Sequence, residues 1–71
     1  MDDIPEGWIL DKLVRLAHLG EPTRYECEFV HMGHGRISKG IAMEPGDAVR
    51  RATEHAVRIN TVLAGQQEMK V

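Results

Sequence analysis

The chain is 71 residues long, which allows one small hydrophobic core and no second one. Nine lysines and arginines against eleven aspartates and glutamates give a formal net charge of −2, a balance that argues against a dedicated nucleic-acid binder. The single cysteine, Cys27, excludes an internal disulfide and a Cys-x-x-Cys zinc site. A chain of this size therefore needs close helix packing or a second copy of itself to be stable.

An amphipathic helix is predicted over residues 4–19. Asp3 followed by Glu6 is typical of a helix start, and Gly20 with Pro22 beyond it is typical of a helix end. Trp8 lies at the edge of the apolar stripe, where we expect it to cover one end of the core. The stripe itself consists of residues at helical spacing: Ile9, Leu10, Leu13, Leu16 and Ala17.

A β-hairpin is predicted next, with strands over residues 24–32 and 36–43 joined by a turn at 33–35. Alternation gives the first strand one core-facing side: Tyr25, Cys27, Phe29 and His31. In the second strand the large apolar residues share a side, opposite Ser38, Gly40 and Ala42: Ile37, Ile41 and Met43. A three-residue loop brings both apolar sides together by three pairings: Tyr25 with Met43, Cys27 with Ile41, and His31 with Ile37.

The last predicted element is a helix over residues 45–64. Pro45 suits its first turn, Asp47 lies near the positive end of the helix dipole, and Gly65 suits the position just past the end. Two central alanines on its inward face would let the helix lie close against a sheet. That face consists of Val49, Ala52, Ala56, Ile59 and Leu63.

The order helix, strand, strand, helix predicts an α+β fold, α-β-β-α, with both helices packed on the Tyr25, Phe29 and Ile41 face of the hairpin. Residues 1–71 are expected to form a single domain with a frayed tail at 66–71. The outer face of the hairpin then lies open, and two explanations remain. Either its charges keep it soluble, or an edge pairs with a second copy to form a four-stranded sheet in a homodimer.

We predict no catalytic residue, no metal site and no cofactor. His31 and His34 flank the turn, but two imidazoles do not make a structural zinc site, and Cys27 lies about 13 Å from His31 along an extended strand. Cys27 therefore lacks a base and is interpreted as a small core hydrophobe rather than a nucleophile. The sequence Gly33-His34-Gly35 lies between strands, whereas a phosphate-binding loop precedes a helix.

Two groups of residues are candidates for binding. On the outward side of the first hairpin strand, carboxylates and apolar side chains form a strip that would suit a basic protein surface: Glu26, Glu28, Val30 and Met32. On the outer side of the last helix lies a basic cluster of Arg50, Arg51 and Arg58, with Glu54 spaced to pair with Arg50 and Arg58. We interpret the cluster as a solvated ion-pair face, with weak anion or nucleic-acid binding as the alternative.

The stretch from Arg36 to Val57, a strand followed by an alanine-rich helix that opens with Pro45-Gly46-Asp47-Ala48-Val49, resembles the final strand and helix of HicB-type antitoxin domains. The resemblance covers about a third of the chain and implies a partial double-stranded-RNA-binding-domain fold. HicB-type domains open on a strand, where this sequence predicts a helix. True double-stranded-RNA-binding domains carry lysines at the start of the last helix, where this chain has Glu44 and Asp47, so duplex RNA binding is not expected.

The whole predicted layout is also similar to small phage- and prophage-encoded α-β-β-α proteins, some of which inhibit host defence. We therefore predict a non-enzymatic interaction protein, phage-encoded by this resemblance, that binds another protein, for example as an inhibitor of a host system. A nucleic-acid-binding or antitoxin-like regulator is the alternative. We expect a cytoplasmic homodimer with no membrane contact, and a protein rather than a nucleic acid as its partner.

Overall fold

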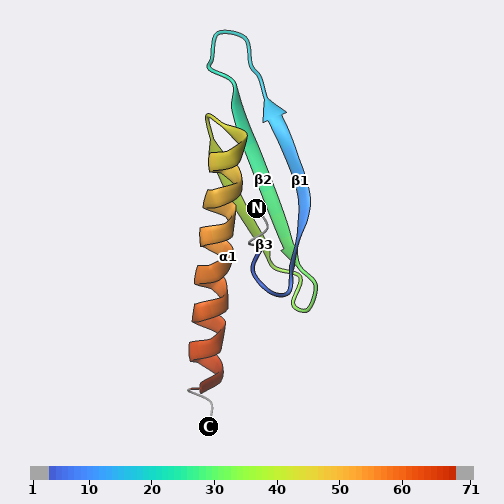
Figure 1. Ribbon diagram of the computed structural model, residues 1–71, viewed down its shortest axis with the longest axis vertical. Helices are drawn as coiled ribbons and strands as arrows, with labels where there is room; N and C mark the ends of the chain where they lie inside the picture. The colour runs from blue at the N-terminus through green and yellow to red at the C-terminus, as the bar shows by residue number, and fades with distance from the viewer. Residues whose placement is uncertain (1–3, 69–71) are drawn as a thin grey trace.

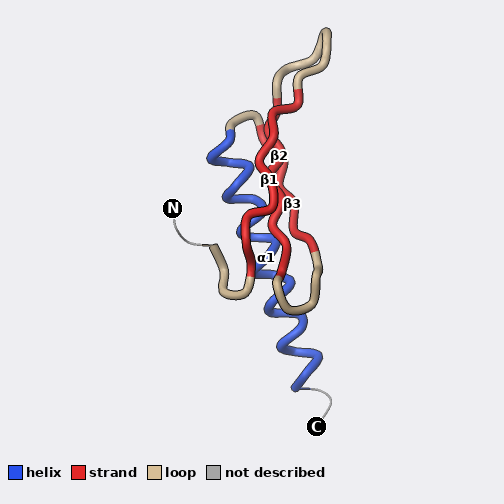
Figure 2. The backbone as a smooth tube through the Cα atoms, turned by 90° about the vertical axis from the view of Figure 1, so that its right-hand side faces the viewer, coloured by secondary structure: helices blue, strands red, loops and turns tan. Residues whose placement is uncertain are grey.

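Three antiparallel strands and one long helix make up residues 4–68, the part of the chain that this computed structural model describes (Figure 1). The strands β1 (Trp8–Leu16), β2 (Arg24–His31) and β3 (Ile37–Ala42) lie in the sheet in chain order. Helix α1 (Pro45–Glu68) then runs across one face of the sheet, while the opposite face carries no described element (Figure 2). The order is β-β-β-α.

The predicted α-β-β-α order is wrong because residues 8–16 form a strand and not part of a helix over 4–19. β1 pairs with β2 along its whole length, and the register shifts by one residue between Leu10 and Lys12. Asp11 is the extra residue of this β-bulge. Leu10 pairs with Phe29 and Leu13 pairs with Cys27, so Leu10 and Leu13 lie on the same side of β1 although they are three residues apart. That three-residue step imitates a helical period.

The predicted register of the second hairpin is also wrong, by one residue. Tyr25 pairs with Ala42 rather than Met43, and Cys27 pairs with Gly40 rather than Ile41. The loop is longer than three residues, and its backbone is closed by a hydrogen bond of 2.9 Å from Gly35 N to His31 O and one of 3.0 Å from His31 N to Arg36 O. The small residues of β3 therefore face the helix, and its isoleucines lie on the open face of the sheet.

Close contact between β3 and α1 explains this register. A Cβ atom at Gly40 would collide with the backbone of Ala48 and Ala52, and Ser38 Oγ donates a hydrogen bond of 2.6 Å to Ala52 O. Isoleucines on this side of β3 would hold the helix away from the sheet and leave Phe29 uncovered. The contact instead uses small residues, all buried: Ser38, Gly40 and Ala42 on the strand, and Ala48, Ala52 and Ala56 on the helix.

Only a few large side chains complete the core. Cys27 and Phe29 are fully buried between β2 and the helix. Trp8 is buried at one end of the sheet, where its indole Nε1 donates a hydrogen bond of 3.0 Å to Asn60 Oδ1 on α1. The predicted role of Trp8 as a cover of the core is confirmed, and so is the predicted burial of Ala52 and Ala56.

The helix is longer than predicted, because it continues through Gly65 to Glu68. Part of the predicted tail is thus helical, and residues 69–71 lie outside the described residues. Asn60 meets Trp8 at the end of the sheet, so about two turns of α1 beyond it run past the sheet (Figure 1). Among residues 4–68, no helix is long and apolar enough to cross a membrane.

Candidate functional site

The open face of the sheet consists of side chains from all three strands, arranged in rows across the strands. Two rows are mainly apolar, and the row between them is charged. Ile9, Ile37 and Ile41 are between 43% and 48% exposed, although each has neighbours on the same face. The rows are Ile9–Val30–Ile37, Lys12–Glu28–Lys39 and Val14–Glu26–Ile41.

The charges in the middle of this face neutralise one another. Glu28 Oε1 lies 3.9 Å from Lys12 Nζ and 3.8 Å from Lys39 Nζ, and Lys39 Nζ lies 3.6 Å from Glu26 Oε2. These distances describe ion pairs rather than hydrogen bonds. Glu28 is only 7% exposed, since it lies between the two lysines and the flanking apolar rows. Two lysines and two glutamates leave the middle of the open face without net charge.

The predicted strip on β2 lies partly on this face. Glu26, Glu28 and Val30 belong to its rows, whereas Met32 follows the end of β2, in the turn, where it is 70% exposed. Sequence reasoning missed the lysine partners of the carboxylates because it assigned Lys12 to a helix and the wrong side of β3 to the core. The open face therefore presents apolar rows around a neutral centre, and the binding role of the strip stays a prediction.

The predicted arginine cluster is spread over several surroundings. Arg50 pairs with Asp47 at 3.2 Å, one helical turn away, and Arg51 donates a hydrogen bond of 3.0 Å to Ile41 O at the end of β3. Arg58 lines a hollow near the other end of the helix, together with Arg36 and other residues. The three arginines thus lie in three different surroundings.

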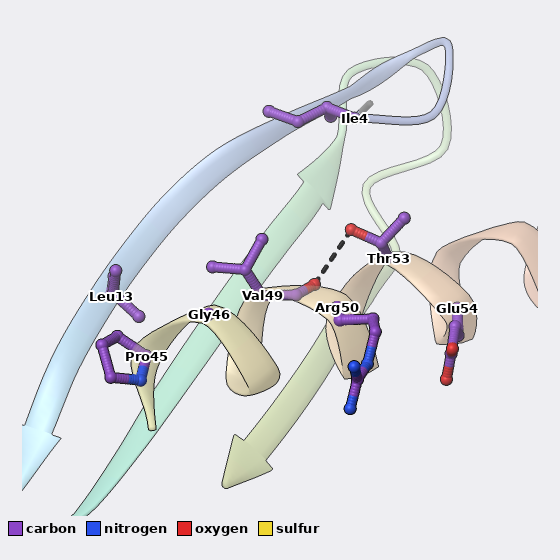
Figure 3. Close-up of a pocket in the computed structure, with 8 residues that line it drawn as sticks. All are labelled: Ile4, Leu13, Pro45, Gly46, Val49, Arg50, Thr53 and Glu54. Atoms are coloured by element: carbon purple, nitrogen blue, oxygen red, sulfur yellow. Dashed lines mark hydrogen bonds between the residues drawn. The ribbon is translucent and has the colours of Figure 1, made fainter. Parts of the chain in front are cut away.

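A groove of about 580 Å³ separates β1 from the first half of α1 (Figure 3). The helix lies mainly on β2 and β3, so the helix-facing side of β1 is only half covered. Figure 3 shows Leu13 across the groove from Pro45 and Val49, with Thr53 Oγ1 bonded back to Val49 O at 2.9 Å. Its walls also include Ile4, Gly46, Arg50 and Glu54. Sequence reasoning missed this groove because it placed a helix, residues 4–19, where β1 lies.

The two turn histidines and Trp8 form an aromatic cluster at the end of the sheet. The rings of His31 and His34 stack with centroids 3.7 Å apart, and Trp8 contacts both edge-on at 5.1 and 5.6 Å. His31 Nδ1 accepts hydrogen bonds from the backbone N–H groups of Gly33 (2.9 Å) and His34 (3.2 Å), and His34 Nδ1 accepts one from Arg36 N (3.1 Å). The imidazoles therefore hold the turn together.

Protonation of His34 is unfavourable in the folded protein. Desolvation lowers the pKa of His34 below its ordinary value, and the charges of His31 and Arg36 lower it further. Within residues 4–68, no group of three or more His, Cys, Asp or Glu side chains could hold a metal ion. Burial raises the pKa of the Cys27 thiol, which disfavours the thiolate that a nucleophile would need.

Comparison with models of protein families, with curated protein sequences and with solved structures gives no match for this chain. The open face and the hollow beside Arg58 are the features that suggest a function.

Proposed function

We propose that this protein is a non-enzymatic interaction protein that binds another protein through the open face of its sheet. The exposed isoleucines carry this proposal: Ile9, Ile37 and Ile41 lie on one sheet face around a neutralised centre. Covering a sheet face that carries apolar rows with a second layer is favourable, because it removes apolar surface from water. The internal ion pairs mean that a partner needs little charge of either sign at the centre of the contact.

The size of the face indicates what kind of contact it supports. Three strands about 4.8 Å apart and about 30 Å long present roughly 400 Å², about half of what each partner buries in a standard interface. A single partner on this face alone would therefore bind transiently.

Self-association fits the same face, and we propose a weak homodimer in which the open faces of two sheets pack together over this small area. Two copies meet there without net repulsion, because the lysines and glutamates of each face cancel. An outside partner would then compete with the second copy.

The proposal includes a cytoplasmic location, which suits a chain whose single thiol, Cys27, is buried and unpaired.

Substitution of an isoleucine on the open face tests this proposal. We expect Ile37→Glu to abolish the dimer measured by light scattering and to remove the partner identified by crosslinking and mass spectrometry from a host lysate. Val57→Glu is the matched control, because Val57 is 49% exposed on α1 and lies outside the open face. Equal behaviour of the two variants and the parent in both assays would overturn the proposal.

A nucleic-acid-binding or antitoxin-like regulator is the second candidate. The observation in its favour is that the first element among the described residues is a strand, β1, which is the order that the HicB-type resemblance implies. Arg50 and Arg51 offer it little support. Arg50 is paired with Asp47, and Arg51 donates a hydrogen bond to the end of β3. DNA or RNA binding that weakens steeply with salt, and that Arg58→Gln reduces, would place this candidate first.

A further inference from the structure

A second hollow, separate from the open face, lies where the β2–β3 turn approaches the far part of α1. Its volume is about 240 Å³. Arg36 is the last residue of the turn, directly before β3, and His55 and Arg58 come from the helix. Apolar side chains from the helix provide the rest of its lining: Ile59, Val62 and Leu63.

The fold brings these two arginines to one hollow from distant parts of the sequence. Arg36 and Arg58 are 22 positions apart, and no sequence pattern links them. Among the described ion pairs, which involve Lys12, Arg24, Lys39 and Arg50, neither Arg36 nor Arg58 has a carboxylate partner. Two guanidinium groups beside an apolar lining therefore favour a ligand that is anionic at one end and apolar at the other.

The size of the hollow restricts that ligand further. About 240 Å³ accommodates one or two side chains, but it is smaller than the sites that enclose whole drug-sized molecules. Val62 is exposed at its edge, on the part of α1 that runs past the sheet, so an extended or helical segment can approach from solvent. A guanidinium group recognises a carboxylate through paired N–H donors, which a peptide supplies with glutamate or aspartate.

We propose that this hollow binds an acidic, apolar segment of a protein, with a leucine-sized side chain against Ile59 and Leu63 and a neighbouring carboxylate between Arg36 and Arg58. This site lies at the end of the molecule and does not depend on the open face. A partner that covers the open face can therefore make a second contact here, and so can a different protein.

An NMR titration of the full chain with synthetic peptides tests the proposal. The probe is acetyl-Glu-Leu-Leu-Glu-Asp-Leu-amide, and the neutral control replaces its acidic residues with Gln and Asn. We expect the acidic peptide to shift the backbone amide signals of Arg36, His55, Ile59 and Val62 and to bind more weakly in 0.5 M salt. The neutral peptide should shift these signals much less at the same concentration.

Variants assign the effect to the two arginines. Arg36→Gln and Arg58→Gln should each weaken binding about two- to fivefold, as expected for partly exposed ion pairs. Arg24→Gln is the matched control. Arg24 is an exposed arginine at the start of β2, beside the β1–β2 connection, where it pairs with Glu21. Four results would each overturn the proposal. They are equal binding of both peptides, signal shifts that map elsewhere, an equal loss of binding in the Arg24→Gln control, and binding of hexanoate without binding of the peptide.

Discussion

At Gly40 the backbone of β3 lies against the backbone of α1 with no space for a side chain. We expect Gly40→Ala to lower the free energy of unfolding by about 1–3 kcal/mol, because its Cβ would collide with main-chain atoms of Ala48 and Ala52 that cannot rotate away. Ala52→Leu should have a similar effect, since Ala52 is fully buried in the same contact. Urea denaturation monitored by circular dichroism measures both variants.

Gly65 provides the control for this prediction. It lies inside α1, and a Cβ added there meets nothing within 4 Å. Gly65→Ala should therefore leave stability unchanged or raise it by up to about 1 kcal/mol through helix propensity alone. If Gly40→Ala instead matches Gly65→Ala, the close contact between strand and helix is wrong.

The lowered pKa of His34 makes the stability of the protein dependent on pH. The pKa of His34 is lower in the folded protein than in the unfolded chain, where it is about 6.5. The unfolded chain therefore binds more protons, and the stabilisation that is complete above about pH 6.5 is lost as the pH falls through the lowered folded pKa. Protonation of Nδ1 would also break the hydrogen bond from Arg36 N.

We predict that the melting temperature falls between pH 7 and pH 5 and that His34→Asn reduces this fall. The asparagine side-chain oxygen can accept the same backbone hydrogen bond but does not titrate. Differential scanning fluorimetry across this range compares the two proteins. Parallel curves for parent and variant would contradict the prediction.

Sequence reasoning placed some of these residues correctly and others on the wrong side. Trp8, Cys27 and Ala52 were predicted to be buried from their type and spacing, and they are. Ser38 and Gly40 were placed outside because isoleucine is more often buried than serine or glycine. That preference fails where a helix lies so close to a strand that only small residues fit, and the depth of such a contact is a tertiary property.

At the scale of the elements, the bulge at Asp11 determines the spacing of inward-facing residues of β1 in the sequence. Without Asp11 the strand Trp8–Leu16 would alternate inward and outward residues without a break. With it, Leu10 and Leu13 share a side at a spacing of three, which a helix also produces. The start of the final helix, by contrast, was predicted correctly at Pro45, because its first turn and its inward stripe are uninterrupted, whereas Gly65 did not end it.

Deletion of Asp11 tests the role of the bulge. We expect the shortened chain to keep its fold and to melt within a few degrees of the parent, because every other residue of β1 keeps its side of the sheet. It should also associate more, since a regular edge strand pairs more readily with another copy. Circular dichroism measures the first effect and light scattering the second.

Deletion of Val14 is the control. It reverses the sides of Arg15 and Leu16 while the bulge remains, so this variant should lose stability. If deletion of Asp11 unfolds the chain as well, the register of β1 is wrong.

At the scale of the whole molecule, the sheet supports only part of α1. Ala48, Ala52 and Ala56 are buried against β3, whereas the turns after Asn60 run past the sheet. We predict that amide hydrogens of residues 61–68 exchange by local fraying and that those of Ala52 and Ala56 exchange only on global unfolding. Native-state hydrogen exchange by NMR measures both, and equal protection along the helix would contradict the prediction.

The candidate surfaces depend on this whole-molecule arrangement, and for that reason the sequence revealed only a part of them. Glu26 and Glu28 could be assigned to the outward side of a strand by alternation. The other features depend on strand order and on where the helix crosses the sheet. They are the lysine partners of these carboxylates, the groove beside Leu13, and the hollow that Arg36 and Arg58 both line. A single sequence contains no short-range pattern for such placements.

The small-residue contact between β3 and α1 also determines how this chain can change by mutation. In most cores, truncation to alanine is the harmful change, because it leaves a cavity. Here Gly40, Ala48 and Ala52 have almost no atoms to lose, so the harmful changes are the ones that add atoms. A saturation mutagenesis survey should therefore show the inverse of the usual pattern at the contact between β3 and α1. The loss of stability should grow with the volume of the introduced side chain and hardly depend on its polarity. The isoleucines of the open face should tolerate most substitutions in a selection for folding alone.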